Sequence, residues 1–299
     1  MVNFASLVVQ LIPITGLYAL VASTFTLAKI ALSVSAPFYY VGLRMLFAGT
    51  LLTLYYFITQ KNTKKLPSQS DILLFLGIIA FHIYFAYMLD LWALQYISSC
   101  DASLIYTLSP FVTAIISYWW FKERLTAIQW IGMSVGFASC LPLIIDSNCN
   151  PSSLKGIIGM FGSMVASSLG WITFKELTDK RQYSPFIING IGMVFGGAAA
   201  LLTSYLTEPW IPSYPVSDWS LFVLYTGMII LVGNFVVYNA YGYLLRKYSA
   251  TFLSYAGLST PIFAALYGWF FLNEYLNPYL PVAVLGIAFG LYCFNIKRY

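Results

Sequence analysis

Two stretches of this chain, SPFVTAIISYWWFKERL at residues 109–125 and TPIFAALYGWFFLNEYL at residues 260–276, share one pattern. Each opens with a hydroxyl residue and a proline and continues through an apolar, aromatic run. Each closes on a glutamate at the same distance from its proline, Pro110 to Glu123 and Pro261 to Glu274. A segment of this kind that occurs twice predicts a chain built from two related halves.

The composition excludes a water-soluble globular protein. Apolar residues make up 60% of the 299 residues and charged residues only 8%, too few to surround a soluble core. A bilayer-spanning helix needs about 20 mostly apolar residues. Such stretches follow one another along nearly the whole chain. We predict an all-α integral membrane protein with ten transmembrane helices, at residues 6–28, 37–59, 71–95, 101–121, 127–145, 155–177, 185–206, 219–244, 249–272 and 279–296.

Basic residues predict how these helices are oriented, because short cytoplasmic loops hold an excess of Lys and Arg. No Lys or Arg precedes Lys29, so we expect a retained first helix instead of a cleaved signal peptide. With both termini in the cytoplasm, eleven basic residues fall inside, and only Lys29 and Lys155 fall outside. The net charge of +5 therefore indicates topology in a lipid bilayer and not nucleic-acid binding.

The repeat extends well beyond the two quoted stretches, because identical residues recur at two constant offsets. An offset of 151 pairs Tyr87 with Tyr238 and Pro110 with Pro261, and an offset of 148 pairs Gly42 with Gly190, Met45 with Met193 and Gly49 with Gly197. We predict two five-helix repeats, residues 1–147 and 148–299. Because five is odd, the second repeat enters the membrane from the opposite side. Inverted repeats of this kind are typical of secondary transporters.

A family resemblance rests on several of these features together. They are the ten helices in two halves, AKIAL at residues 28–32, Arg44 within FYYVGLRMLFAG at residues 38–49, and the paired proline-to-glutamate segments. Together they resemble the drug/metabolite transporter superfamily, in its EamA-type branch. The resemblance covers almost the full chain and implies a central cavity surrounded by the first four helices of each half.

One departure limits what this resemblance implies about energy coupling. The small multidrug transporters, which look like half of this chain, carry a proton-coupling glutamate eight residues before the lysine that closes helix one. Val21 and Ser167 stand at those places here, before Lys29 and Lys175. The resemblance therefore does not imply proton drive through this position.

Polar and aromatic groups at membrane depth are the candidates for substrate binding. Ionisable groups inside the bilayer are costly and usually face a cavity or a partner. The candidates are Phe25, His82, Tyr87, Asp90, Tyr106, Trp171, Lys175, Asn234, Tyr238 and Tyr255. A pocket lined by them suits a small amphipathic solute with a flat or zwitterionic part. Alternatives stay open: Asp90 is also a structural partner for Arg44, Lys175 a helix-end cation, and His82 a packing residue or a proton carrier.

A second group is expected to act in gating or in structure. It comprises Lys29, Arg44, Pro110, Glu123, Pro261 and Glu274. The prolines remove helix hydrogen bonds and mark bending points. The glutamates lie near the first turn of the next helix and are expected to cap its amides. For Arg44 we favour contacts that hold the fold.

Two glycine pairs, Gly132-x-x-x-Gly136 and Gly286-x-x-x-Gly290, predict close helix packing. The packing is expected either between the halves of one chain or between subunits, so the protein is a monomer or a homodimer. The four cysteines lack metal-ligand spacing. We therefore expect no metal and no cofactor.

These features predict a secondary transporter or exchanger that moves a small organic metabolite across the bacterial cytoplasmic membrane by alternating access, together with a counter-substrate or ion. The resemblance, with a composition typical of AT-rich genomes, implies an amino acid or nucleoside-derived metabolite such as S-adenosylmethionine. Export of toxic metabolites or drugs is an alternative. A membrane enzyme would need clustered carboxylates or histidines, and a receptor a larger extramembranous part. The sequence supplies neither.

Overall fold

A computed structural model describes residues 4–59, 65–97, 102, 105–145, 154–210, 215–272 and 278–295. Glu274 lies outside these residues, and so does the side chain of Lys29. Within the described ranges every named element is helical, and the one β-type contact is an isolated antiparallel bridge between Ser35 and Val216. The prediction of an all-α fold is confirmed.

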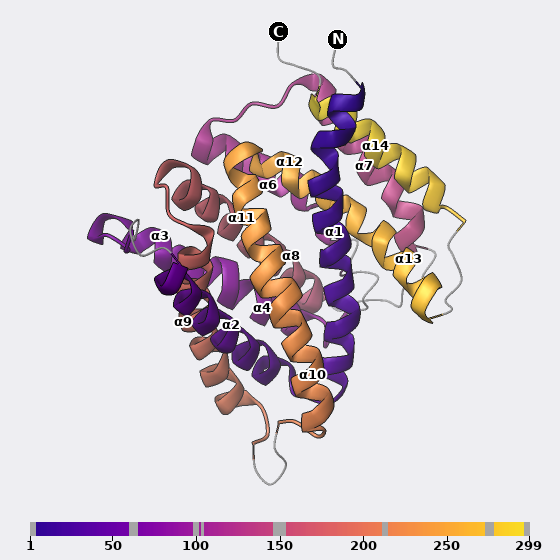
Figure 1. The fold of residues 1–299 in the computed structure, drawn as a ribbon. Coiled ribbons are helices and arrows are strands. Elements are labelled where there is room, and N and C mark those ends of the chain that lie inside the picture. Colours follow the sequence, from indigo (N-terminus) through magenta and orange to yellow (C-terminus); the bar gives the residue numbers. More distant parts are fainter. Residues whose placement is uncertain are drawn as a thin grey trace. The chain divides into compact units, whose positions relative to one another are not determined.

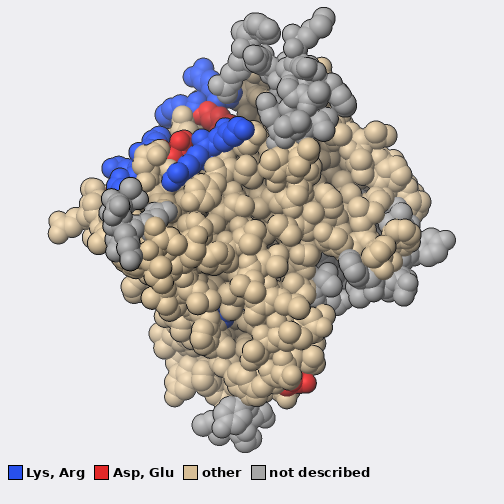
Figure 2. Space-filling view, in the orientation of Figure 1, with Lys and Arg blue, Asp and Glu red and all other residues tan. Residues whose placement is uncertain are grey.

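Six helical stretches in the described part of the chain are long and apolar enough to cross a membrane. They are residues 12–33 within α1 (Phe4–Ser33), α2 (Pro37–Thr59), residues 69–93, residues 154–180, α9 (Pro185–Thr207) and residues 219–247. The other four predicted helices correspond to α6 (Ser109–Phe121), α7 (Ala127–Ile145), α12 (Ala250–Ala256) with α13 (Thr260–Leu272), and α14 (Leu280–Asn295). Ten helices are therefore consistent with the structure. Figure 2 shows that most of the surface in view is uncharged, as a bilayer-facing surface requires.

The third and eighth predicted helices are each interrupted by a π-helical segment. The third runs through η1 (Gln69–Asp71), α3 (Ile72–Gly77), the π-helix η2 (Ile78–Tyr84) and α4 (Phe85–Ala93). The eighth runs through α10 (Trp219–Ile229), the π-helix η4 (Ile230–Val237) and α11 (Tyr238–Lys247). These two helices are equivalent at the offset of 151. Interruptions of this type are rare and are frequent at functional sites.

Both predicted bending prolines begin a helix. Pro110 is the second residue of α6, and Pro261 is the second residue of α13. An amide donor is not required in the first helical turn, so proline is tolerated there. The 3-10 turn η5 (Gly257–Ser259) separates α12 from α13 directly before Pro261. The ninth helix is thus broken where the proline was expected to bend it.

Glu123 was predicted to cap the next helix, and in the structure two other residues do so. Thr126 and Gln129 form a reciprocal capping box at the start of α7, with the Thr126 amide donating to Gln129 Oε1 at 2.9 Å and the Gln129 amide to Thr126 Oγ1 at 3.3 Å. The Glu123 amide instead donates to the Ser117 carbonyl at 3.4 Å, after Lys122 has turned left-handed at φ 57°. Glu123 therefore helps to end α6, because Thr126 and Gln129 already satisfy the first turn of α7.

The chain packs into two compact units, each of which draws helices from both predicted repeats. Unit 1 comprises residues 1–23, 93–161 and 248–299, and unit 2 comprises residues 24–92 and 162–247. The division of the sequence at residue 147 remains a prediction about repeats and does not describe these units.

In unit 2, α2 and α9 cross at four glycines. A Cβ on Gly49 would stand 2.8 Å from the Gly190 carbonyl oxygen, and one on Gly197 would stand 2.9 Å from the Gly42 carbonyl oxygen. Residue numbers rise along α2 while they fall along α9, so the helices are antiparallel. The offset of 148 pairs Gly42 with Gly190 and Gly49 with Gly197. Replacing each glycine by its equivalent therefore converts the contact of Gly49 with Gly190 into that of Gly197 with Gly42. A local two-fold axis across the helices follows, which supports the predicted inversion.

In unit 1, α7 and α14 lie side by side and repeat this arrangement (Figure 1). A Cβ on Gly290 would stand 2.6 Å from the Gly132 carbonyl oxygen, while Gly286 faces Ser139. The order of contacts is again reversed along the two helices. The prediction that the glycine pairs are packing faces between the halves is confirmed.

The two ends of α9 are tied to neighbouring loops of unit 2 in different ways. Beyond its C-terminal end, Glu208 accepts hydrogen bonds from the amides of Phe38 and Tyr39 at 2.7 and 2.8 Å, which caps α2. Before its N-terminal end, Arg181 pairs with Asp71 at 3.3 Å. That basic end also carries Lys65 and Lys180 and was predicted to be cytoplasmic.

Candidate functional site

Arg44 on α2 is buried between two tyrosine rings. Its side chain is 7% exposed, and its guanidinium carbon lies 5.0 Å from the centre of the Tyr40 ring and 5.2 Å from that of Tyr87. Nη1 donates a hydrogen bond to the Tyr40 hydroxyl at 3.1 Å, whereas Nε has no hydrogen-bond partner. No carboxylate among the described residues forms an ion pair with it. The rings stabilise the cation but leave donors for an anion.

Tyr87 on α4 and Tyr238 on α11 are joined through their hydroxyl groups. The two tyrosines are equivalent in the repeats, so their contact lies on a local two-fold axis of unit 2. Through this pair the Arg44 site continues into a second group of aromatic residues. Unequal neighbours surround the symmetric pair, with Arg44 beside Tyr87 and His82 beside Tyr238.

His82 lies in the π-helix η2 and is 3% exposed. Its ring centre lies 4.3 Å from that of Trp171 on α8 (Leu154–Lys175) and 5.4 Å from that of Tyr238. A Cβ on Gly170 would stand 2.5 Å from His82 Cα, so this glycine permits the close approach of α8. Nε2 of His82 has no hydrogen-bond partner. His82 thus contacts Trp171 and Tyr238 through its ring.

Asn234 lies in the π-helix η4 and is 1% exposed. Its amide nitrogen contacts two methionine sulfurs, Met45 Sδ at 3.3 Å and Met193 Sδ at 3.6 Å. These methionines are equivalent at the offset of 148. The amide oxygen Oδ1 has no partner. The π-helices η2 and η4 therefore each place one buried polar side chain with an unsatisfied atom.

We call this group of residues the central cluster. It comprises Tyr40, Arg44, His82, Tyr87, Trp171, Asn234 and Tyr238. A buried polar atom left without a partner costs about 1–3 kcal/mol, so Arg44 Nε, His82 Nε2 and Asn234 Oδ1 are three groups in the cluster with hydrogen-bonding capacity that the protein itself does not use. An anionic group fits Arg44, flat rings fit Trp171 and Tyr238, and hydrogen-bonding edges fit His82 and Asn234.

Three of the predicted binding residues stand apart from the central cluster in the structure. Asp90 is half-buried and forms no ion pair with Arg44, so the proposed structural pair is not present. Lys175 donates to the Leu245 carbonyl at 2.5 Å and pairs with Asp179 at 3.4 Å, which ties α8 to α11. Phe25 is 60% exposed. Lys175 is thus explained by its helix-end role.

Tyr255 was expected to line the cavity, and the structure corrects this. Its ring is fully buried in unit 1 between the glycines of α7 and α14, and its hydroxyl lies 3.2 Å from the Ile287 carbonyl and 3.4 Å from that of Gly132. The space left by the glycines is filled by this ring. Tyr255 therefore packs the crossing. Tyr106 is half-buried in the same unit.

Tyr40 is not among the residues predicted from the sequence, and Arg44 was placed in the group expected to act in gating or in structure. Tyr40 precedes Arg44 by four residues on one helix, which places the two side chains on the same face. This spacing was visible in the sequence. The absence of a described carboxylate beside Arg44 was not, because it depends on how other helices pack.

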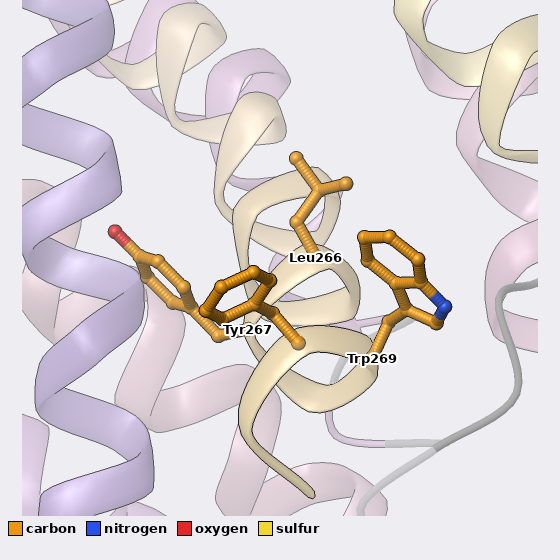
Figure 3. Close-up of a pocket in the computed structure, with 4 residues that line it drawn as sticks. Leu266, Tyr267 and Trp269 are labelled. Carbon is orange, nitrogen blue, oxygen red and sulfur yellow. The ribbon is translucent and has the colours of Figure 1, made fainter. Parts of the chain in front are cut away.

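A hollow on α13 is lined by apolar and aromatic side chains of the described residues. Leu266, Tyr267, Trp269 and Phe270 line it (Figure 3). The Tyr267 hydroxyl donates to the Ala19 carbonyl at 3.2 Å and so does not serve the hollow. This apolar surface suits a lipid chain and lacks the polar groups that a charged solute requires.

Membrane-spanning helices with a buried, unsatisfied polar cluster define a multi-pass transport protein. The chain belongs to the EamA-like transporter family, whose model matches residues 5–145 and again residues 154–296. It is a transporter and not an enzyme.

Three proteins illustrate the similarity. An S-adenosylmethionine/S-adenosylhomocysteine transporter of Chlamydia trachomatis serovar L2 is 32% identical over 90% of this chain and 84% of its own length. The uncharacterized inner membrane transporter YedA of Escherichia coli K12 is 24% identical over 97% of this chain and 93% of its own. A solved crystal structure shares the fold, with a TM-score of 0.76, 16% identity, and 95% and 98% of the two chains covered.

Proposed function

We propose that this protein exchanges S-adenosylmethionine for S-adenosylhomocysteine, or a closely related nucleoside-linked amino acid, across the bacterial cytoplasmic membrane. The observation that carries the proposal is Arg44, a buried cation with an unpartnered Nε and no described carboxylate partner. A substrate carboxylate would supply the missing anion. The similarity to chlamydial transporters of these metabolites supports the same class of substrate.

The other parts of the central cluster fit the remaining groups of such a substrate. A purine ring is flat and stacks against aromatic side chains such as Trp171 and Tyr238. Its edge carries both donors and acceptors, which suit His82 Nε2 and Asn234 Oδ1. One solute with a carboxylate at one end and a purine at the other would satisfy all three unpartnered atoms.

The mechanism proposed is alternating access by two inverted repeats. The family model matches the chain twice, and the antiparallel glycine contacts of α2 with α9 and of α7 with α14 support the inversion. Inverted repeats place the site at their interface, and one part moves against the other around it. Exchange explains how a product of the same shape leaves as fresh substrate enters.

The test is counterflow in proteoliposomes that contain purified protein. We expect vesicles loaded with unlabelled S-adenosylmethionine to accumulate the labelled compound transiently, with saturation and without chemical change. S-adenosylhomocysteine should compete well, and adenosine or methionine alone poorly, because each lacks one half of the contacts. Absence of counterflow would contradict the proposal. Equal competition by drugs without a carboxylate would favour the exporter alternative.

His82 is predicted to be a hydrogen-bonding ligand and not a proton carrier, because aromatic rings surround its imidazole. His82→Gln preserves hydrogen bonding and removes titration, so we expect transport with an unchanged pH profile between about pH 5 and 8. His82→Ala should raise the apparent KM about fivefold to tenfold, the worth of one hydrogen bond. A flattened pH profile in His82→Gln would instead identify a proton carrier.

Both termini are proposed to lie in the cytoplasm. Lys180 precedes the first residue of α9 and Ser217 follows its last residue, so single cysteines there report opposite sides of the membrane. In a cysteine-free background we expect Lys180→Cys to react with a membrane-impermeant maleimide only after the cells are opened. Ser217→Cys should react in intact cells. The reverse pattern would overturn the orientation.

A further inference from the structure

We infer that Asn239 is a positioning residue for substrate binding, which sets the direction of Asn234 and Tyr238 by holding the end of the π-helix η4. The inference rests on the proposed function, since it assigns those two residues to the substrate site. Asn239 itself lies on α11, one residue after Tyr238, and is 3% exposed.

The end of a π-helix leaves a backbone group to be satisfied. The Tyr238 amide donates to the Gly233 carbonyl, five residues back, as π-helical bonding requires. Where the chain returns to bonds that reach four residues back, one carbonyl is passed over by the main-chain amides. A carbonyl left unsatisfied inside the membrane costs several kcal/mol, since no water replaces the lost bond.

The side chain of Asn239 satisfies the carbonyls at this junction. Its Nδ2 donates to the Phe235 carbonyl at 2.8 Å and to the Asn234 carbonyl at 3.3 Å. An amide side chain offers two donors on one nitrogen, so it serves two carbonyls together. Without the Asn239 amide, we expect the chain to form an uninterrupted α-helix, in which these carbonyls accept main-chain bonds. This change would rotate Asn234 relative to Tyr238.

A second asparagine fixes the direction of the first. Asn189 on α9 is fully buried, and its Nδ2 donates to Asn239 Oδ1 at 3.2 Å. Its neighbour Gly190 is part of the crossing between α2 and α9. The two asparagines thus connect the end of the π-helix η4 to the crossing of α2 and α9.

Among the described residues, the side chain of Asn239 forms no hydrogen bond with a side chain of the central cluster, and its one bond to that cluster is to the backbone carbonyl of Asn234. Its replacement therefore tests positioning and not a direct contact. Asn239→Leu keeps a side chain that branches at the same carbon, though a bulkier one, and lacks the amide. Asn239→Asp has the same shape but presents an oxygen where the two carbonyls need a donor.

The matched control is Ser204→Ala, on the same unit near the far end of α9. Ser204 is fully buried and accepts a hydrogen bond from Trp210 Nε1 at 3.1 Å. Its loss also removes a side-chain hydrogen bond, that of the half-buried Trp210, but away from the π-helix. A general loss of stability would lower the Tm and the Vmax of both proteins without changing the KM.

The experiment measures counterflow of S-adenosylmethionine and, separately, hydrogen–deuterium exchange of the full-length protein in detergent without substrate. For Asn239→Leu and Asn239→Asp we expect a rise in KM of about tenfold or more, and faster exchange confined to peptides that cover residues 230–241. Ser204→Ala should keep the wild-type KM and the wild-type exchange in that segment.

The two readouts separate the inference from the proposed function. Wild-type protein without S-adenosylmethionine counterflow contradicts the proposed function, while the exchange data still report on the π-helix. Wild-type exchange at residues 230–241 in both Asn239 variants would overturn the inference. So would an unchanged KM, even if the Tm of the variants is lower.

Discussion

Arg44→Met protein is expected to fold normally and to lose transport of carboxylate-bearing substrates. Removing one partner of a buried, hydrogen-bonded charge pair costs about 2–5 kcal/mol, which is roughly a 30-fold or greater loss of affinity. Methionine keeps an unbranched apolar stem of similar length. Because Arg44 has no carboxylate partner among the described residues, its removal also relieves an isolated buried charge.

Two measurements separate these effects. Counterflow of S-adenosylmethionine reports binding, and thermal unfolding in detergent reports stability, for which we expect an unchanged or raised Tm. Arg44→Lys keeps the charge but loses the planar fork, so it should retain only part of the affinity. Arg124→Ala, at an exposed position between α6 and α7, is the control and should resemble the wild type. Wild-type KM in Arg44→Met would remove this residue from the site.

Gly49→Ala is expected to destabilise the protein although it adds one methyl group. The new Cβ would stand 2.5 Å from the Val194 amide nitrogen and 2.8 Å from the Gly190 carbonyl oxygen. Both are backbone atoms of α9, so neither can move aside without separating the helices. Overpacking of this kind costs about 1–3 kcal/mol, and more where the backbone must shift.

Gly227→Ala on α10 is the matched control, because its added Cβ would meet no atom of the described residues within 4 Å apart from its chain neighbours and the backbone of its own helix. Alanine there should be neutral or stabilise the helix by up to about 1 kcal/mol. Thermal unfolding of the two variants in the same detergent therefore gives shifts of different sign or size. Equal shifts would show that the crossing of α2 and α9 is looser than the structure indicates.

The helices could be predicted from the sequence because the bilayer sets a minimum apolar length. The predicted span at residues 37–59 coincides with α2, and that at 185–206 nearly coincides with α9. The π-helices η2 and η4 could not be predicted. One inserted residue shifts the phase of an amphipathic pattern. An apolar run inside a membrane has no such pattern, so the insertion leaves no trace in the sequence.

Depth in the membrane predicted the central cluster only in part. Three of the residues it selected, His82, Trp171 and Tyr238, contact one another in unit 2, and Asn234 is buried in η4; their role in binding stays a prediction. Depth does not give the direction in which a side chain points, and so Tyr255 was placed in the cavity although it fills a helix crossing. Arg44 was taken as structural because its neighbours come from two helices, and sequence alone does not show whether an acid is among them.

The hydroxyl contact between Tyr87 and Tyr238 would be kept if the two repeats exchanged their conformations. If each half adopts the conformation of the other, every contact is replaced by its counterpart. A contact between equivalent residues is its own counterpart, and this one is therefore restored unchanged. The tyrosine pair would therefore form the same contact in both end states of the proposed cycle. Arg44 has no such counterpart, because Gly192 stands at its equivalent position. In the proposed cycle the inward-open and outward-open states would therefore differ in energy, because Arg44 makes contacts that no residue of the other repeat can reproduce.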